Sequence, residues 1–338
     1  MQKGSVIQLS ARSIGRQVAR FILLMLAVSV VTFALVGLSP IDPGQADVGQ
    51  NGLLGMSAEK RAQLASYWGA DLPIWERYLN WAGAFVTGDW GTSLRYNAPV
   101  TQVIATRAAN SLLLLAAAWL ISGVLGFALG VAAGARKGSV VDKLVCGYCY
   151  LLASTPAFWV GLIMLMVFAV GLGWFPLGFS APIGVPASQV TVFQQLQCMV
   201  LPALTLSMVG VANIALHTRE KTIDVLQEPY IRFARARGAS NRQALRRHGL
   251  RNLALPALTL QFASISEIFG GSVLVEQVFS YPGLGQAAVT AGLGGDAPLL
   301  VAIALVSAAL VFAGNLVANI LYGVLDPRIK EGGAREQR

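Results

Sequence analysis

Long apolar runs alternate with short polar stretches along this chain of 338 residues. Six runs approach or exceed the roughly 20 apolar residues that a helix needs to cross a membrane. The pattern therefore predicts an all-α polytopic membrane protein with six transmembrane helices. In the third run, Pro156 is expected to kink the helix, because proline removes one backbone hydrogen bond. The runs lie near Phe21–Leu38, Ser111–Ala133, Leu144–Gly171, Met199–Leu216, Leu253–Phe279 and Pro298–Leu321.

Composition supports the same class. Mean hydropathy is +0.61 and 55% of residues are hydrophobic, which is too apolar for an ordinary soluble domain of this length. A cleaved secretory signal would explain the basic start of the first run. However, that run exceeds a usual signal core, and SPIDPG after Leu38 is a poor cleavage site. We therefore interpret residues 1–20 as an N-terminal tail and residues 21–338 as a single transmembrane domain.

The distribution of Lys and Arg predicts the orientation. With a cytoplasmic N-terminus, 20 of the 25 Lys and Arg fall on the cytoplasmic side and five on the other. Positive charge accumulates in cytoplasmic loops, so both termini are expected inside the cell. The net charge of +9 is thus explained by topology, and no nucleic-acid partner is indicated.

The loop at 39–107 is expected to be the largest extracytoplasmic segment. Ser57 is a plausible N-cap for a helix ending near Tyr67, and a second amphipathic helix is expected to start near Pro73. Aromatic residues gather at membrane–water interfaces, so a small lid on the outer leaflet is one interpretation. A contact surface for an external binding protein is the other. The four tryptophans of this loop are Trp68, Trp75, Trp81 and Trp90.

A basic segment with helix start and stop signals lies between the fourth and fifth runs. Nine of the 25 Lys and Arg fall between Arg219 and Arg251. Pro229 suits the first position of a helix, and Gly238 suits its left-handed C-terminal cap. Ser240 and Gln243 form a capping box that opens a second helix. The spacing predicts a helix–turn–helix that docks a soluble partner, although a basic loop that only fixes topology is an alternative.

The second basic helix is expected to expose Arg242, Arg246 and Arg247 on one face. Asn252 and Pro256 are expected to mark re-entry into the membrane.

Elsewhere, Cys146 and Cys149 form a C-x-x-C spacing without a partner pair of cysteines or a following histidine, so we interpret them as packing residues.

The segment ARARGASNRQALRRHGLRNLALP resembles the EAA loop of bacterial ABC importer permeases of the peptide/opine/nickel family. In that family this loop docks into a groove of an ATPase subunit. Arg232 and Phe233 depart from the general pattern, which has Glu and Ala there. The resemblance assigns ATPase docking to residues 217–252 and the adjoining helix start, here named the docking loop, through Arg232, Ala234, Arg235, Arg237, Gly238, His248, Asn252 and Pro256.

Further segments resemble family motifs in the family's order. They are GDWGTSLRYNAPV at 88–100, STPAFWVGL at 154–162, LGWFPLGF at 172–179, FSYPGLGQ at 279–286 and LDPRIK at 325–330. SPIDPG at 39–44 departs from the family's PGDP. The resemblance assigns an outer loop or gate to Phe279, Pro282, Gly283 and Gly285.

This resemblance implies a type I ABC importer permease fold in the bacterial cytoplasmic (inner) membrane. Its implied partners are a second homologous permease, two ATPase subunits, an extracytoplasmic substrate-binding protein and membrane lipid. The chain contains no G-x-x-x-x-G-K-[ST] motif, so ATP and Mg are expected on the ATPases, with no cofactor, metal or catalytic residue on this chain. Glycines at 123, 126, 130 and 134 would allow the close helix approach that rocking between two states requires.

Two carboxylates lie inside the fifth run, Glu267 and Glu276, where a charge is costly enough to suggest function. They are about 13 Å apart along a helix and are expected within roughly 40° of one face, toward the solute pathway, with Gly270 and Gly271 making room between them. An acidic residue at 267 resembles the nickel branch of the family. We therefore favour a nickel or metal chelate over a short peptide as substrate. A structural role for Glu267, hydrogen-bonded to a neighbouring span, is the alternative.

Two other classes of function are possible in principle. A membrane-embedded enzyme is disfavoured because the only histidines, His217 and His248, lie at or beyond the membrane edge and no H-E-x-x-H motif occurs. A stand-alone secondary transporter is disfavoured by the docking loop and by the absence of an inverted-repeat signal.

Overall fold

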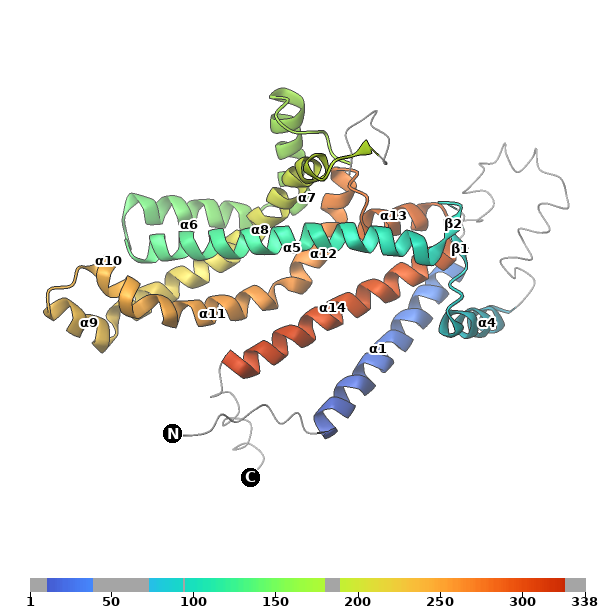
Figure 1. Ribbon diagram of the computed structural model, residues 1–338, viewed down its shortest axis with the longest axis horizontal. Helices are drawn as coiled ribbons and strands as arrows, with labels where there is room; N and C mark the ends of the chain where they lie inside the picture. Colours follow the sequence, from blue (N-terminus) through green and yellow to red (C-terminus); the bar gives the residue numbers. More distant parts are fainter. Residues whose placement is uncertain (1–10, 39–72, 94, 180–188, 326–338) are drawn as a thin grey trace. The chain divides into compact units, whose positions relative to one another are not determined.

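Helices dominate the computed structural model, which describes residues 11–38, 73–93, 95–179 and 189–325 (Figure 1). The elements before residue 180 are α1 (Ala11–Gly37), α4 (Ile74–Thr87), β1 (Thr92–Ser93), β2 (Ala98–Pro99), α5 (Val100–Gly134), α6 (Val140–Ala153), α7 (Ala157–Met164) and the π-helix η1 (Leu165–Gly171). The later ones are α8 (Val192–Gln227), α9 (Pro229–Ala236), α10 (Asn241–Ala244), the π-helix η3 (Leu245–Gly249), α11 (Leu250–Ala263), α12 (Ile265–Val278), α13 (Leu284–Leu293) and α14 (Ala297–Leu325).

Four described helices are long and apolar enough to cross a membrane, and two bent helix pairs raise the count to six if each pair is one span. This agrees with a polytopic membrane protein. The all-α prediction is incomplete in one detail, because β1 and β2 form a two-stranded antiparallel ladder with Thr92 opposite Pro99.

The third apolar run is two helices rather than one kinked helix. The chain turns by 107° between α6 and α7. Ser154 and Thr155 donate their hydroxyls to the carbonyls of Tyr150 and Leu151, and such bonds compete with helix continuation. Pro156 then N-caps α7 and disfavours a helical residue before it. The predicted kink is therefore a complete break.

The fifth run also differs from the prediction. Pro256 lies inside α11, and the helix passes through Asn252 without interruption, so the chain stays helical across the point where re-entry into the membrane is expected. A proline inside a membrane helix is tolerated where neighbouring groups compensate for the lost hydrogen bond. The bend of 48° comes instead at Ser264, between α11 and α12.

The described chain divides into two compact units. Unit 1 holds residues 112–281 and those from 313 onward, and unit 2 holds residues up to 111 together with 282–312. Helices α5 and α14 each contribute to both units.

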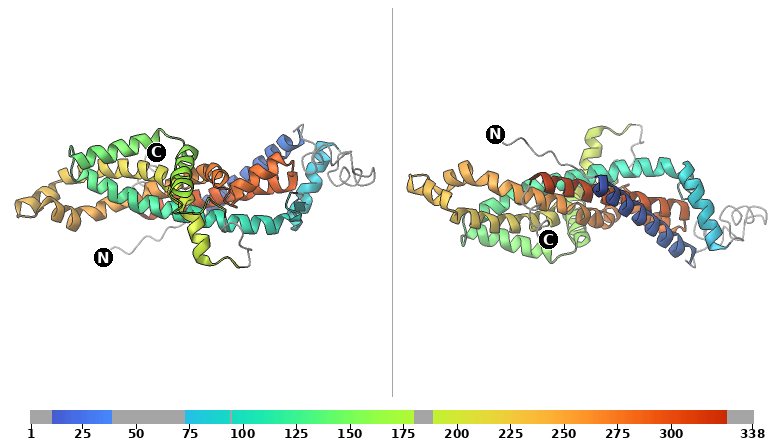
Figure 2. Two further views of the ribbon diagram at one scale, coloured as in Figure 1. Left: turned by 90° about the horizontal axis from the view of Figure 1, so that it is seen from above. Right: turned by 90° about the horizontal axis from the view of Figure 1, so that it is seen from below.

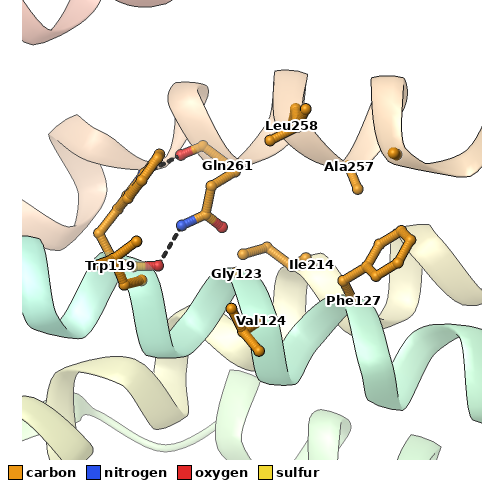
Figure 3. A pocket seen from close by; sticks show the side chains of 10 residues that line it. Trp119, Gly123, Val124, Phe127, Ile214, Ala257, Leu258 and Gln261 are labelled. Atoms are coloured by element: carbon orange, nitrogen blue, oxygen red, sulfur yellow. Dashed lines mark hydrogen bonds between the residues drawn. The ribbon is translucent and has the colours of Figure 1, made fainter. Parts of the chain in front are cut away.

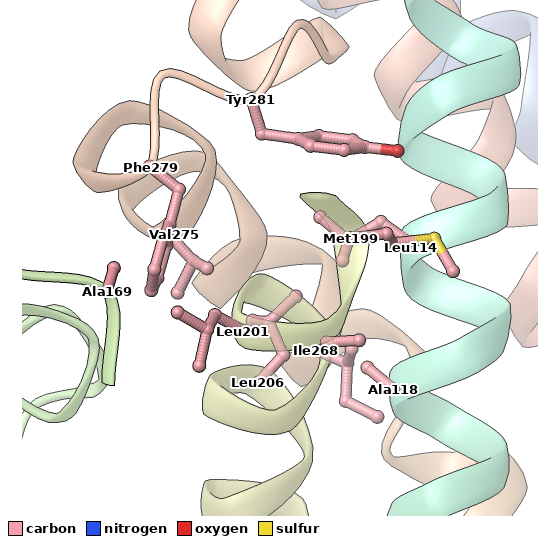
Figure 4. Packing of buried hydrophobic residues seen from close by; sticks show 11 residues of the cluster. Leu114, Ala118, Ala169, Met199, Leu201, Leu206, Ile268, Val275, Phe279 and Tyr281 are labelled. Carbon is pink, nitrogen blue, oxygen red and sulfur yellow. The ribbon is translucent and has the colours of Figure 1, made fainter. Parts of the chain in front are cut away.

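Helix α8 is the centre of unit 1, since α6, α7, α11 and α12 all pack on it. Leu114 and Ala118 of α5, Leu201 and Leu206 of α8, and Phe279 beyond α12 meet in one buried cluster (Figure 4).

The glycines of α5 bring it against the backbone of α8. A Cβ atom on Gly130 would lie 2.6 Å from the carbonyl oxygen of Ala215, and one on Gly134 would lie 2.6 Å from that of Arg219. No side chain fits at such distances. The expected close approach is therefore confirmed, and the contact lies within this subunit.

In unit 2, aromatic rings connect α1, α4 and the segment that follows α4. Pro73 precedes the first turn of α4, which confirms the helix predicted there, and Gly88 ends it in a left-handed conformation. Trp81 contacts the rings of Phe33 and Phe85, and Phe85 stacks on Trp90 at 4.5 Å. The predicted helix at Ser57–Tyr67, Trp68 and SPIDPG lie outside the described residues.

Asp296 is a buried polar centre in unit 2. Its carboxylate accepts hydrogen bonds from the Ser93 hydroxyl at 2.5 Å and from the backbone N–H of Arg95 at 3.2 Å. It also accepts from the N–H of Leu299 in the first turn of α14. The GDWGTS segment is thereby fixed to the start of α14.

Candidate functional site

The predicted helix–turn–helix of the docking loop is present. Gly238 has a positive φ of 90°. Its backbone N–H donates to the Arg235 carbonyl at 2.9 Å, and the N–H of Ala239 donates to the Ala234 carbonyl at 3.1 Å. This pair of bonds is a Schellman motif, the usual way to end a helix with glycine. The Ser240–Gln243 capping box starts the second helix, as predicted.

The docking loop lies at one end of unit 1, where α9 and α10 follow the extended end of α8 (Figures 1 and 2). Ile231 and Leu245 turn inward and are almost fully buried. The Asn252 side chain donates to the Tyr230 hydroxyl at 2.8 Å, which ties the start of α11 to α9. The loop is therefore folded on unit 1 and is not a loose basic tether.

The outer face of the docking loop is basic and carries one large apolar side chain. Phe233 is 64% exposed, and the Arg237 guanidinium lies over its ring at 5.8 Å. Among the described residues the ion pairs are Arg219–Asp142 and Lys221–Asp224, so the arginines from α9 to η3 have no carboxylate partner in that part of the chain. Eight residues are predicted to contact an ATPase. The exposed ones are Arg232, Arg237, Gly238, His248 and Asn252, and the half-buried ones are Ala234, Arg235 and Pro256.

A buried ion pair fixes the helices that support this loop. Arg219 of α8 donates to Asp142 in the first turn of α6 through Nε at 2.5 Å and Nη2 at 2.8 Å. Asp142 also accepts from the backbone N–H of Gly138, in the connection from α5. Bidentate pairs of this kind are geometrically specific. The pair joins α8 to α6 and to the α5–α6 connection.

The two carboxylates of α12 lie on opposite sides of the helix, so the expectation that they share one face was wrong. Nine residues advance a helix by about 900°, which is half a turn beyond two full turns. Glu276 is fully buried, whereas Glu267 and Gly270 are exposed and Gly271 is half-buried. Among the two glutamates, only Glu267 is open to a solute.

Glu267 borders a small cavity at the break between α11 and α12. The cavity measures about 40 Å³, and the Asn213 side chain of α8 donates to Glu267 at 3.4 Å. Ser264, at the bend itself, is a further lining residue. The cavity is thus lined by three polar side chains, one from α8, one from the bend and one from α12.

A larger cavity of about 290 Å³ lies between α5, α8 and α11, with apolar walls that include Val124, Phe127 and Leu258 (Figure 3). At one end, the Trp119 indole N–H donates to the Gln261 carbonyl at 2.7 Å. The Gln261 side-chain amide donates back to the Trp119 carbonyl. This reciprocal pair joins α5 to α11 three residues before the Ser264 bend.

The predicted outer loop is closely packed. Phe279 is buried, and its carbonyl accepts a hydrogen bond from the N–H of Phe179 at 3.0 Å. The last residue of the family-like segment 172–179 is therefore in contact with the first residue of the segment 279–286. Within unit 2, Asn110 donates to the Pro282 carbonyl at 2.9 Å, and Gly283 and Gly285 are buried around the start of α13.

Sequence reasoning missed two features. Asp142 was not singled out, although Ser139-x-x-Asp142 has the spacing of a helix start and the structure shows Ser139 capping α6. The Ser93–Asp296 contact joins residues 203 positions apart, and a single sequence holds no signal for it.

Cys149 is buried and packs in a cluster with Leu152 and Ala215, which agrees with its interpretation as a packing residue.

These observations describe a polytopic membrane protein with a folded, positively charged loop and a carboxylate at a broken span. The chain belongs to the family of binding-protein-dependent transport system inner membrane components, whose profile matches residues 126–331. It is therefore a multi-pass inner-membrane transport subunit and not itself an enzyme. The peptide/opine/nickel resemblance is confirmed at the level of this family.

The chain is similar to permease proteins, and the similarity covers nearly the whole length of each. The chain is 35% identical over 308 residues to the oligopeptide transport system permease protein AppB of Bacillus subtilis (strain 168), covering 91% of this chain and 95% of AppB. It is 32% identical to the di/tripeptide transport system permease protein DppB of Pseudomonas aeruginosa (strain UCBPP-PA14), covering 94% and 98%. It is 30% identical to the dipeptide transport system permease protein DppB of Escherichia coli (strain K12), covering 96% and 99%.

Proposed function

We propose that this chain forms half of the translocation pathway of an ATP-driven importer of short peptides. The observation that carries the proposal is the docking loop, a folded helix–turn–helix whose exposed arginines lack carboxylate partners among the described residues. In this proposal both termini and the docking loop are cytoplasmic, and the six spans include the two broken ones.

The partners follow from that surface. A second homologous permease completes the pathway, two ATPase subunits carry ATP and Mg, and an extracytoplasmic protein delivers the solute. An acidic groove on an ATPase would complement the loop's arginines, and the exposed Phe233 would add apolar contact area. Movement of the ATPase would reach the spans through α8, since Arg219 ties that helix to α6 and the α5 glycines hold it against α5.

The pathway is assigned to the side of α12 that carries Glu267 and Gly270. A carboxylate inside a membrane segment faces protein or water, because contact with lipid is too costly. Glu267 is exposed on this chain by itself. It therefore faces either the second permease or the aqueous route between the two, and both places lie at the centre of the assembly.

Peptide is the better-supported substrate class. AppB and both DppB relatives are named as oligopeptide, di/tripeptide and dipeptide permeases. The preference for nickel drawn from Glu267 alone is not confirmed. Nickel favours imidazole ligands, and no group of three His, Cys, Asp or Glu that could hold a metal occurs among the described residues.

Uptake by the complete complex tests this assignment. Reconstituted with its second permease, ATPases and binding protein, the chain should support ATP-dependent uptake of a radiolabelled dipeptide and not of a nickel chelate. Uptake of nickel without uptake of any dipeptide would contradict the proposal. Omitting ATP is the control for leakage.

A further inference from the structure

The small cavity beside Glu267 has the size of one polar group. Its volume is about 40 Å³, whereas a single water needs roughly 10–15 Å³. It cannot enclose a peptide, but it can receive one terminal group of a peptide that lies outside it. The lining residues are Ala157, Leu206, Val209, Gly210, Asn213, Ser264, Glu267, Ile268 and Gly271.

The polar groups of this cavity offer acceptors rather than donors. Glu267 supplies a carboxylate. The Asn213 amide N–H₂ points to that carboxylate at 3.4 Å, which leaves the amide oxygen for a ligand. The Ser264 hydroxyl gives its proton to the Gln261 carbonyl at 2.8 Å, so its remaining lone pairs can only accept. A ligand with several donors and one positive charge therefore matches the cavity.

An ammonium group has those properties, since it carries three donors and a single charge. One carboxylate balances that charge, while the buried Leu206 and Ile268 form apolar walls beside it. A divalent metal matches less well, because the site supplies one carboxylate and no imidazole or thiolate.

We propose that this cavity binds the α-ammonium group of a peptide in transit. The inference rests on the proposed peptide substrate. Every peptide with an unmodified N-terminus carries this group whatever its side chains. Recognition at Glu267 would therefore hold the common end of the peptide and leave its variable part in the wider route.

Binding to the assembled permease–ATPase complex without its binding protein tests the proposal. The probes are radiolabelled dialanine, N-acetyl-dialanine and N-acetyl-alanyl-lysine, measured on complexes in nanodiscs. The unaltered complex should bind dialanine at least about tenfold more tightly than either acetylated peptide, the effect of one charge-assisted contact. Glu267→Gln should lower dialanine affinity to that of N-acetyl-dialanine and leave the latter unchanged.

Two further variants separate recognition from general damage. Ser264→Ala should weaken dialanine binding by less than Glu267→Gln does. Asp89→Asn removes a carboxylate that is exposed between α4 and β1 and does not line the cavity, so this variant should bind all three probes like the unaltered complex.

Equal affinity of Glu267→Gln and the unaltered complex for dialanine would overturn the inference. Binding of N-acetyl-alanyl-lysine as tight as that of dialanine would also overturn it, because the cavity would then accept any ammonium. If dialanine uptake by the complete complex persists in either case, the proposed function stands and only this inference fails. If the complete complex takes up no peptide, the proposed function itself is wrong.

Discussion

At the scale of single residues, Asp142 and Arg219 form the polar contact that joins α6 to the first residues of the docking loop on α8. Both side chains are largely withdrawn from water, with exposures of 5% and 22%. Removing one member of such a pair leaves the other charge without compensation, which costs far more than the pair contributes by itself.

Asp142→Asn should therefore destabilise the subunit by about 3–5 kcal/mol, since it keeps the shape and loses the charge. The measurement is the thermal unfolding midpoint of the purified complex. The matched control is Asp224→Asn, because the Lys221–Asp224 pair is exposed and loosely spaced at 3.7 Å. Equal midpoints for the two variants would show that the buried pair is dispensable.

Glu267 is a second residue whose position only the folded structure gives. The sequence correctly predicted a carboxylate inside the fifth apolar run. The angle around the helix axis between Glu267 and Glu276 was misjudged. Helical geometry alone places the two on opposite faces. Which of them is exposed depends on how α12 packs against α8, and no local pattern encodes that.

At the scale of elements, α5 and α8 pack at backbone distance. The glycine spacing at 123, 126, 130 and 134 predicted a close contact but not its partner helix. Contact through backbone atoms leaves no layer of flexible side chains between the helices. We infer that α5 and α8 move together when the docking loop moves.

Gly130→Ala tests this packing. The new methyl group would lie 2.6 Å from both the Ala215 oxygen and the Thr218 Cβ, so the helices must separate. Overpacking of this kind costs about 1–3 kcal/mol. The unfolding midpoint and the yield of assembled complex should both fall.

Gly147→Ala is its control, because a Cβ there meets no atom within 4 Å. If Gly130→Ala lowers the unfolding midpoint no more than Gly147→Ala does, the tight α5–α8 contact is contradicted.

The broken spans show where sequence patterns stop being informative. Pro156 correctly marked a disturbance of the third run, yet the turn of 107° also needs the hydroxyls of Ser154 and Thr155. Pro256 lies inside α11 and does not break it. The real bend, at Ser264, has no proline. There the reciprocal Trp119–Gln261 hydrogen bonds join α5 to α11, a tertiary contact across 142 positions.

At the scale of the whole molecule, hydropathy and motif order were enough to predict the membrane class and the family. Capping residues were enough to predict the helix–turn–helix of the docking loop, because those signals act locally. The cavities, the buried ion pair and the orientation of Glu267 all depend on residues far apart in the chain. Those features required the folded structure.

We propose that the Gly238 turn couples ATP hydrolysis to transport, and the variant Gly238→Val puts this coupling to the test. Gly238 has φ of 90° and open space around it, so valine would fail through backbone strain, about 1–2 kcal/mol, and not through a clash. Gly238→Asn should be tolerated better, because asparagine adopts left-handed conformations more readily.

The measurement is ATP hydrolysis by the reconstituted complex, stimulated by its peptide-loaded binding protein. Gly238→Val should insert into the membrane normally, lose most of the stimulation and retain weakly bound ATPases, while Gly238→Asn and the exposed-helix control Gly147→Val keep the stimulation. Full stimulation of hydrolysis by Gly238→Val, with its ATPases bound, would contradict the docking role of this turn.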